Sequence, residues 1–121
     1  MLPKNFRLKK KSEFAATFFQ KKFVNSDLFT LNIGKNKTNQ SYPTKVAFVV
    51  SKKIDKRAVV RNIIKRRMRA AYWEILKENN IDLSKWISMI FIAKSECLDA
   101  NYEQILYQMR HIINKGLKKY V

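Results

Sequence analysis

The chain has 121 residues, 46% of them apolar and 12% aromatic, which suits a single domain over residues 1 to 121 with a modest core. Its 26 lysines and arginines against nine acidic residues give a net charge of +17, and this excess predicts a polyanionic partner, first of all nucleic acid. No apolar run approaches the roughly 18 to 20 residues of a membrane span, and the N-terminus lacks the apolar core of a signal peptide. We therefore expect a cytoplasmic protein without membrane contact.

Residues that could perform catalysis are few. His111 is the one histidine, and its place opposite the apolar positions of a helical pattern predicts a solvent-facing side chain. Cys97 is the one cysteine, and we expect it to be a small hydrophobic residue near a strand end. Because neither can complete a set of metal ligands, we expect no catalytic residue and no metal site on the protein, although nine acids leave a paired-carboxylate site open.

The N-terminal part begins with a basic segment. Residues 1 to 11 carry five basic residues and no acid, which predicts an extended, mobile arm that attracts phosphates. Ser12 is expected to cap a short helix that runs to about Lys21, with Phe14 and Phe18 on one face. Four phenylalanines lie between positions 14 and 23, and either all are core residues or some form an aromatic surface open to a ligand.

Three apolar segments predict strands. Residues 28–33 alternate apolar and polar side chains, a polar turn follows over residues 34–42, and residues 45–50 are almost continuously apolar, so we expect a hairpin with a loose loop whose second strand is central. Residues 86–93 form another apolar strand. Asn101, with Gln104 three positions later, predicts the start of an amphipathic helix that ends near Gly116.

A long basic helix is expected from Lys56 to about Asn79. It contains no Gly or Pro, and an apolar stripe recurs every three or four residues at Val60, Ile64, Met68, Ala71 and Ile75. The opposite face is cationic, and no acid occurs between positions 56 and 69, which favours an anion-binding surface over an ordinary solvated face. The residues of this cationic face are Arg61, Asn62, Lys65, Arg66 and Arg69.

The element order is α-β-β-α-β-α, with room for one further small strand before the basic helix. It predicts a mixed α+β or α/β sandwich in which helices pack on a central sheet. General statistics favour a right-handed connection through the basic helix.

The spacing R-N-x-x-K-R-x-x-R, here Arg61, Asn62, Lys65, Arg66 and Arg69, resembles the signature of the bacterial ribonuclease P protein subunit. Many members carry Arg directly after the Asn, where this chain has Ile63. Residues 7–10, followed by Phe14 and Phe18, are similar to the N-terminal pattern of the family. The resemblance covers nearly the whole chain and implies a left-handed crossover through the basic helix, as in some ribosomal proteins.

The resemblance also implies a division of labour. An RNA subunit would be the catalyst, with Mg²⁺ bound mainly by that RNA, and the protein would assist removal of the 5′ leader from precursor tRNA without an obligate protein partner. The residues implied to bind the catalytic RNA are Lys52, Lys53, Arg57, Arg61, Asn62, Lys65, Arg66 and Arg69. The implied leader-binding cleft comprises Phe14, Phe18, Thr30 and Asn32, of which Asn32 occupies a position that is aromatic in some relatives.

Three other functions share part of this pattern. A structural ribosomal or other RNA-packing protein would have the same charge and size. A metal-dependent protein nuclease would need acids near the basic surface, where they are scarce, and a DNA-binding module would need a helix-turn-helix pair, which is not evident.

Overall fold

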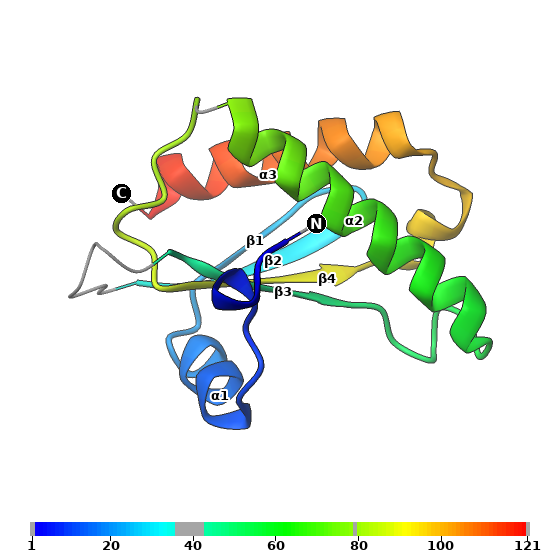
Figure 1. The fold of residues 1–121 in the computed structure, drawn as a ribbon, viewed down its shortest axis with the longest axis horizontal. Helices are drawn as coiled ribbons and strands as arrows, with labels where there is room; N and C mark the ends of the chain where they lie inside the picture. The colour runs from blue at the N-terminus through cyan, green and yellow to red at the C-terminus, as the bar shows by residue number, and fades with distance from the viewer. Residues whose placement is uncertain (1, 36–42, 79, 121) are drawn as a thin grey trace.

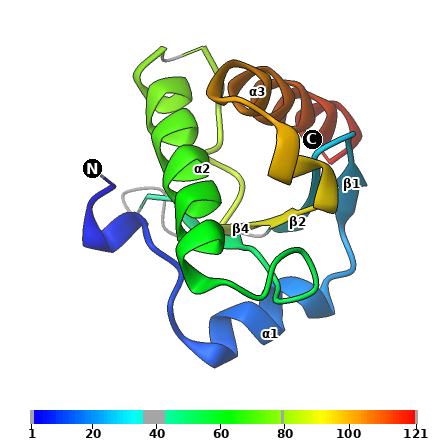
Figure 2. The ribbon, with the colours of Figure 1, turned by 90° about the vertical axis from the view of Figure 1, so that its right-hand side faces the viewer.

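A four-stranded sheet with helices on both faces forms the molecule (Figure 1). The computed structural model describes residues 2–35, 43–78 and 80–120. Helices α2 and α3 cover one face of the sheet and α1 lies on the other (Figures 1 and 2). The elements are η1 (Lys4–Phe6), α1 (Lys11–Phe19), β1 (Phe23–Asn25), β2 (Phe29–Gly34), β3 (Lys45–Val49), α2 (Ala58–Glu78), β4 (Ser88–Ala93), η2 (Ser95–Asp99) and α3 (Tyr102–Lys119).

The strands lie in the order β1-β2-β4-β3. The β1–β2 and β2–β4 pairs are antiparallel, and the β3–β4 pair is parallel. The predicted hairpin between residues 28–33 and 45–50 is therefore wrong, because β4 lies between these two strands. The predicted central position of the second strand is also wrong. β3 is an edge strand, and its free edge is covered in part by the N-terminal segment, where the Leu8 N–H donates to the Val46 carbonyl oxygen at 2.9 Å.

The connection from β3 through α2 to β4 is left-handed. In Figure 2, β3 and β4 both point toward the viewer with β3 to the left of β4, and α2 lies above them and runs away from the viewer. The connection leaves β3, crosses above the sheet and comes back on the right of β3. A connection with this geometry is left-handed. The expectation drawn from the family resemblance therefore holds, and general statistics for such connections would have been wrong here.

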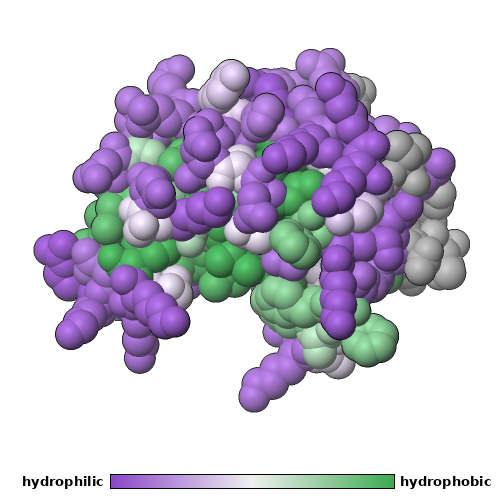
Figure 3. Space-filling view, turned by 180° about the vertical axis from the view of Figure 1, so that it is seen from behind, coloured by the Kyte–Doolittle hydropathy of each residue, from purple (hydrophilic) through white to green (hydrophobic). Residues whose placement is uncertain are grey.

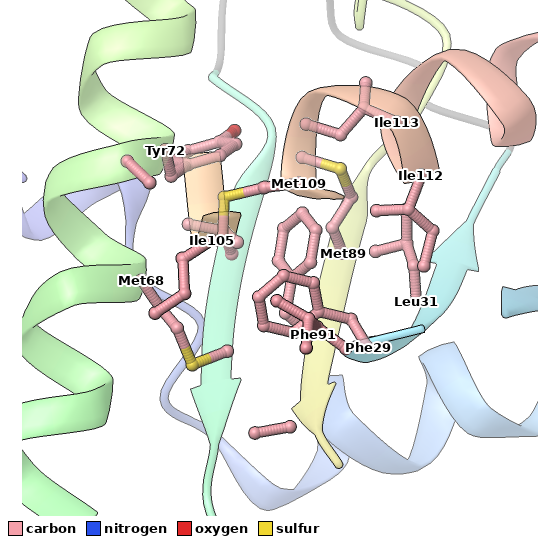
Figure 4. Packing of buried hydrophobic residues seen from close by; sticks show 14 of the residues in the cluster. Phe29, Leu31, Met68, Tyr72, Met89, Phe91, Ile105, Met109, Ile112 and Ile113 are labelled. Atoms are coloured by element: carbon pink, nitrogen blue, oxygen red, sulfur yellow. The ribbon is translucent and has the colours of Figure 1, made fainter. Parts of the chain in front are cut away.

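The larger core lies between the sheet and the pair α2 and α3. Alternation along β2 and β4 sends Phe29, Leu31 and Phe91 to this side, where they pack against Met68, Tyr72 and Met109 (Figure 4). The predicted stripe of α2 is buried at its last four positions, and its first position, Val60, is half-buried.

Helix ends agree with the predictions only in part. Asn101 caps α3 as predicted, because its side-chain oxygen accepts the Gln104 N–H and the Gln104 side chain accepts the Asn101 N–H, each at 2.9 Å. Helix α3 nevertheless continues past Gly116. A Cβ there would stand 2.9 Å from Ile33 Cδ1 and 3.0 Å from Trp86 Cη2, so this glycine permits close packing and does not end the helix.

The other predicted boundaries shift slightly. Helix α1 begins at Lys11, with Lys10 as its N-cap, because the Glu13 carboxylate accepts the Lys10 N–H, so Ser12 is not the cap. It ends at Phe19, before the predicted Lys21. The described part of α2 ends at Glu78; the predicted end at Asn79 and most of the polar turn at 34–42 lie outside the described residues.

The N-terminal segment packs against the domain. Leu2 and Leu8 are buried, and residues 4–6 form a short 3₁₀ helix, which differs from the extended arm that the charges predict. The reason is that its apolar side chains alternate with the lysines and reach the core. The mobility of residues 1 to 11 in solution stays a prediction.

Candidate nucleic-acid interface

Cations gather on the outer side of α2 and just before its first residue. We define the basic face as Arg61, Asn62, Lys65, Arg66 and Arg69 together with Lys52, Lys53 and Arg57 just before the helix. Because the apolar stripe of α2 faces the core, these side chains are left on the outer side, where Asn62 and Arg66 are exposed and Lys65 and Arg69 are half-buried. Among the described residues, none of the cations at 65, 66 and 69 forms an ion pair. Their charge is therefore available to an anionic ligand.

The start of α2 is organised around Asp55. Its carboxylate accepts the Arg57 backbone N–H at 2.8 Å and two guanidinium hydrogen bonds from the same residue at 3.1 and 3.0 Å. The Arg57 hydrogen bonds hold the pKa of Asp55 down at about 2. Arg61 Nη1 donates to the carbonyl oxygens of Asp55 and Lys56 at 3.0 and 2.8 Å. Two of the four arginines of the predicted site, Arg57 and Arg61, are thus used to hold the loop onto the helix.

A second surface lies on the opposite side of the sheet. We define the aromatic face as Phe14 and Phe18 of α1 with Thr30 and Asn32 of β2. The two β2 residues alternate with buried core residues and so face the α1 side. Phe14 packs on a small apolar cluster of Leu8, Ala47 and Ile90, whereas Phe18 is 43% exposed. Figure 3 shows apolar surface gathered on the α1 side of the molecule, bordered by projecting hydrophilic side chains.

The polar residues of the aromatic face differ in their partners. Thr30 Oγ1 donates to Asn25 Oδ1 at 2.7 Å, which places the Asn25 side chain beside the predicted site. The half-buried Asn32 amide has no hydrogen-bond partner among the residues that the structure describes. Asn32 can therefore both donate to and accept from a ligand. Sequence reasoning missed Asn25 because its contact depends on the β1–β2 pairing.

Helix α1 is fixed by its other flank. Thr17 Oγ1 lies 2.6 Å from Ser88 Oγ, and Lys45 Nζ lies 2.7 Å from Glu13 Oε2. The hydrogen bond from Lys45 is the main cause that lowers the pKa of the Glu13 carboxyl. These contacts anchor α1 at the first residues of β3 and β4. The flank of α1 that carries Phe14 and Phe18 consequently faces the open part of the sheet.

The remaining candidate residues are accounted for structurally. Cys97 is buried as predicted, its Sγ donates to the Leu28 carbonyl oxygen at 3.3 Å, and burial raises the pKa of its thiol to about 11. His111 is exposed as predicted and stacks on Tyr107. Within the described ranges there is no group of three or more His, Cys, Asp or Glu residues that could hold a metal ion. None of the described helices is long and apolar enough to cross a membrane.

The fold and the two surfaces define a small α+β protein with a basic helix on one side of its sheet and exposed aromatics on the other. The family model described as Ribonuclease P matches residues 2–116. The chain is 34% identical over 119 residues to the ribonuclease P protein component of Bacillus cereus, with 98% of this chain and 97% of that protein covered. It is 30% identical to the same component of Alkaliphilus oremlandii, with 90% and 89% covered.

Solved structures agree with these relatives. The RNase P protein of Staphylococcus aureus matches with a TM-score of 0.76 at 25% identity, covering 92% of this chain and 94% of that one. A mutant of the S. aureus protein described as defective in mRNA degradation activity matches with a TM-score of 0.77 at 26% identity, covering 93% and 89%. The Thermotoga maritima protein, at 18% identity and a TM-score of 0.73 with 90% and 96% covered, shares the fold.

The chain belongs to the bacterial ribonuclease P protein family. It is the protein component of a ribonucleoprotein endoribonuclease that processes the 5′ end of tRNA, and its partner is the ribonuclease P RNA. The alternative of a structural ribosomal protein is not favoured.

Proposed function

We propose that this chain binds the ribonuclease P RNA through the basic face and the 5′ leader of precursor tRNA through the aromatic face. The observation that carries the proposal is the run of cations at positions 65, 66 and 69 of α2, which lack acidic partners among the described residues. Arginine guanidinium groups fork onto phosphate oxygens, and each neutralised phosphate releases bound counterions. The exposed Asn62 adds a group that both donates and accepts.

The leader is proposed to lie across the aromatic face. Phe18 offers a half-exposed ring for an unpaired base, and stacking of this kind is tolerant of sequence. Asn32 offers hydrogen bonds where some relatives have an aromatic side chain. A leader-bearing precursor should therefore bind more tightly than mature tRNA, because only the precursor supplies the unpaired strand.

Catalysis is proposed to belong to the RNA. Mg²⁺ prefers an octahedral set of oxygen ligands, and the described acids of this chain do not cluster into such a set. The protein does not fit as the holder of the metal, so we assign Mg²⁺ to the RNA of the holoenzyme. The positive charge of this chain would lower the repulsion between the two RNAs, so that less Mg²⁺ is needed. The cytoplasm, where tRNA precursors are made in bacteria, is the proposed compartment.

The test is a reconstitution. Purified protein is added to a bacterial ribonuclease P RNA, and leader cleavage is followed across a Mg²⁺ titration. We expect the protein to promote cleavage at Mg²⁺ concentrations where the RNA alone is slow, and to cleave nothing by itself. Unstructured mRNA is included as a second substrate because of the activity ascribed to the S. aureus protein. Steady cleavage of either substrate by protein free of RNA would contradict the assignment of catalysis to the RNA.

A further inference from the structure

A hollow lies on the flank of α1 away from the aromatic face. It is a cleft of about 560 Å³ between the N-terminal segment, α1 and the first residues of β3 and β4. Helical spacing separates it from the aromatic face, because its α1 residues are Glu13, Ala16 and Thr17, followed by the C-cap Gln20, and Phe14 and Phe18 do not line it. Its size lies within the range of about 300 to 1,000 Å³ that is typical of sites for small organic groups. The functions proposed above do not use it.

The cleft has an apolar interior and a cationic mouth. The apolar lining includes the side chain of Leu8, which is buried, and the side chain of Ile87, which is 47% exposed. Cations surround this interior, and the single carboxylate, that of Glu13, is ion-paired with Lys45 at 2.7 Å. Arg7 is held in place because its Nε donates to the Leu2 carbonyl oxygen at 3.2 Å. The basic residues that line the cleft are Lys4, Arg7, Lys9, Lys10 and Lys45.

The hydroxyl of Ser88 adds a directional polar group to the lining of the cleft. Thr17 Oγ1 donates its single proton to the Glu13 carbonyl oxygen at 2.8 Å, so in the 2.6 Å contact between the hydroxyls of Thr17 and Ser88 the serine must be the donor. Ser88 Oγ then keeps acceptor capacity toward the cleft that it lines. A ring that carries an N–H group can meet this acceptor while its faces contact aliphatic side chains.

We propose that this cleft is a second RNA subsite, which takes the base of one unpaired nucleotide within an RNA strand. The apolar interior can contact the faces of a base, and Ser88 can accept from its N–H edge. The cations can bind the phosphate of the nucleotide. The five basic residues that line the cleft against one carboxylate exceed the charge of a single phosphate, which favours a strand over a free nucleotide. The inference rests on the proposed RNA-binding function but uses a different flank of α1.

The test follows methyl resonances of the full-length protein during titration with a short single-stranded oligouridylate. The methyl groups of Ala16 and Ile87 report on the cleft, and those of Val49 and Ile92, on the α1 side of the sheet, report on the neighbourhood of the aromatic face. We expect both pairs to shift. Shifts only at Val49 and Ile92 would overturn the second subsite, whereas shifts only at Ala16 and Ile87 would support it and count against the leader site.

Two further ligands separate the sources of binding. Uridine monophosphate should bind at least tenfold more weakly than the oligomer, and equal affinity would overturn an RNA-strand site in favour of a free nucleotide. An abasic strand of the same length should leave the Ala16 and Ile87 methyl groups unshifted. Equal shifts with the abasic strand would show that the cleft takes phosphate only.

Variants complete the test. Ala16→Trp fills the cleft from the exposed side of α1 and should weaken oligomer binding roughly fivefold to tenfold, the lower part of the range for one stacked base. Ile87→Ser removes the apolar rim in case the first variant does not fold, and thermal unfolding is recorded for both. Phe18→Ala is the matched variant, and it should abolish the shifts at Val49 and Ile92 while sparing those in the cleft. Unchanged affinity in both cleft variants would overturn the proposal.

Discussion

Replacement of Phe18 by Ala tests whether the ring of Phe18 binds RNA or only packs in the core. Phe18 is 43% exposed, so it buries a little over half of its surface. Complete burial would make truncation cost roughly 3 to 5 kcal/mol, and the burial seen here scales this to about 2 kcal/mol of unfolding free energy. Loss of one stacked base should remove about 1 to 3 kcal/mol of binding free energy, which is about 5-fold to 150-fold in affinity for leader-bearing tRNA.

The assay compares precursor with mature tRNA in the reconstituted holoenzyme, well below the unfolding temperature of the variant. Affinity for precursor should fall, and affinity for mature tRNA and for the catalytic RNA should not. Phe19→Ala is the matched control, because the neighbouring ring is 83% exposed and should affect neither stability nor binding. A lowered unfolding temperature with an unchanged preference for precursor would return Phe18 to a purely structural role, and an equal effect at Phe19 would refute the stacking geometry.

Four further outcomes are expected. Arg66→Ala should weaken binding to the catalytic RNA and reduce the slope of log affinity against log salt by about one, and an unchanged salt titration would mean a solvated side chain. Ile63→Arg should strengthen the same binding, because Ile63 is 39% exposed on α2 beside the basic face. The Asp55–Arg57 pair lowers the pKa of Asp55 to about 2 from 3.8, so its stabilisation should be present above about pH 4 and vanish as pH falls through 2; thermal unfolding of Asp55→Asn should then approach that of the parent protein only at the acid end. Gly116→Ala should destabilise by about 1 to 3 kcal/mol in denaturant unfolding, because the added methyl group meets two buried side chains, and a gain in stability would contradict this.

Local patterns predicted the helices well. The stripe of α2 and the Asn101 cap depend on residues three or four positions apart, and such neighbours meet in any helix. Gly116 shows the limit of this reasoning. Its neighbours in sequence indicate a helix end, but the contacts that require a glycine come from β2 and from the segment before β4.

Strand order and the partners within the site could not be predicted in the same way. Residues 28–33 and 45–50 look like consecutive strands of a hairpin, and only the pairing of both with β4 separates them. The alternation in β2 correctly places Thr30 and Asn32 on one face, whereas the hydrogen bond from Thr30 to Asn25 needs the β1–β2 register. The ion pair between Arg57 and Asp55 is local. Because the two residues are only two positions apart, the sequence could have indicated it.

The position of β4 between β2 and β3 affects how the chain can fold during synthesis. β1 and β2 can pair as soon as residue 34 has emerged, but β3 has no strand partner until β4 emerges about 40 residues later. At roughly 5 to 20 residues per second, this delay is several seconds. During this delay, the apolar stripe of α2 has no complete sheet to cover. The last third of the chain therefore closes the domain, and a stop codon before β4 should leave an aggregation-prone fragment.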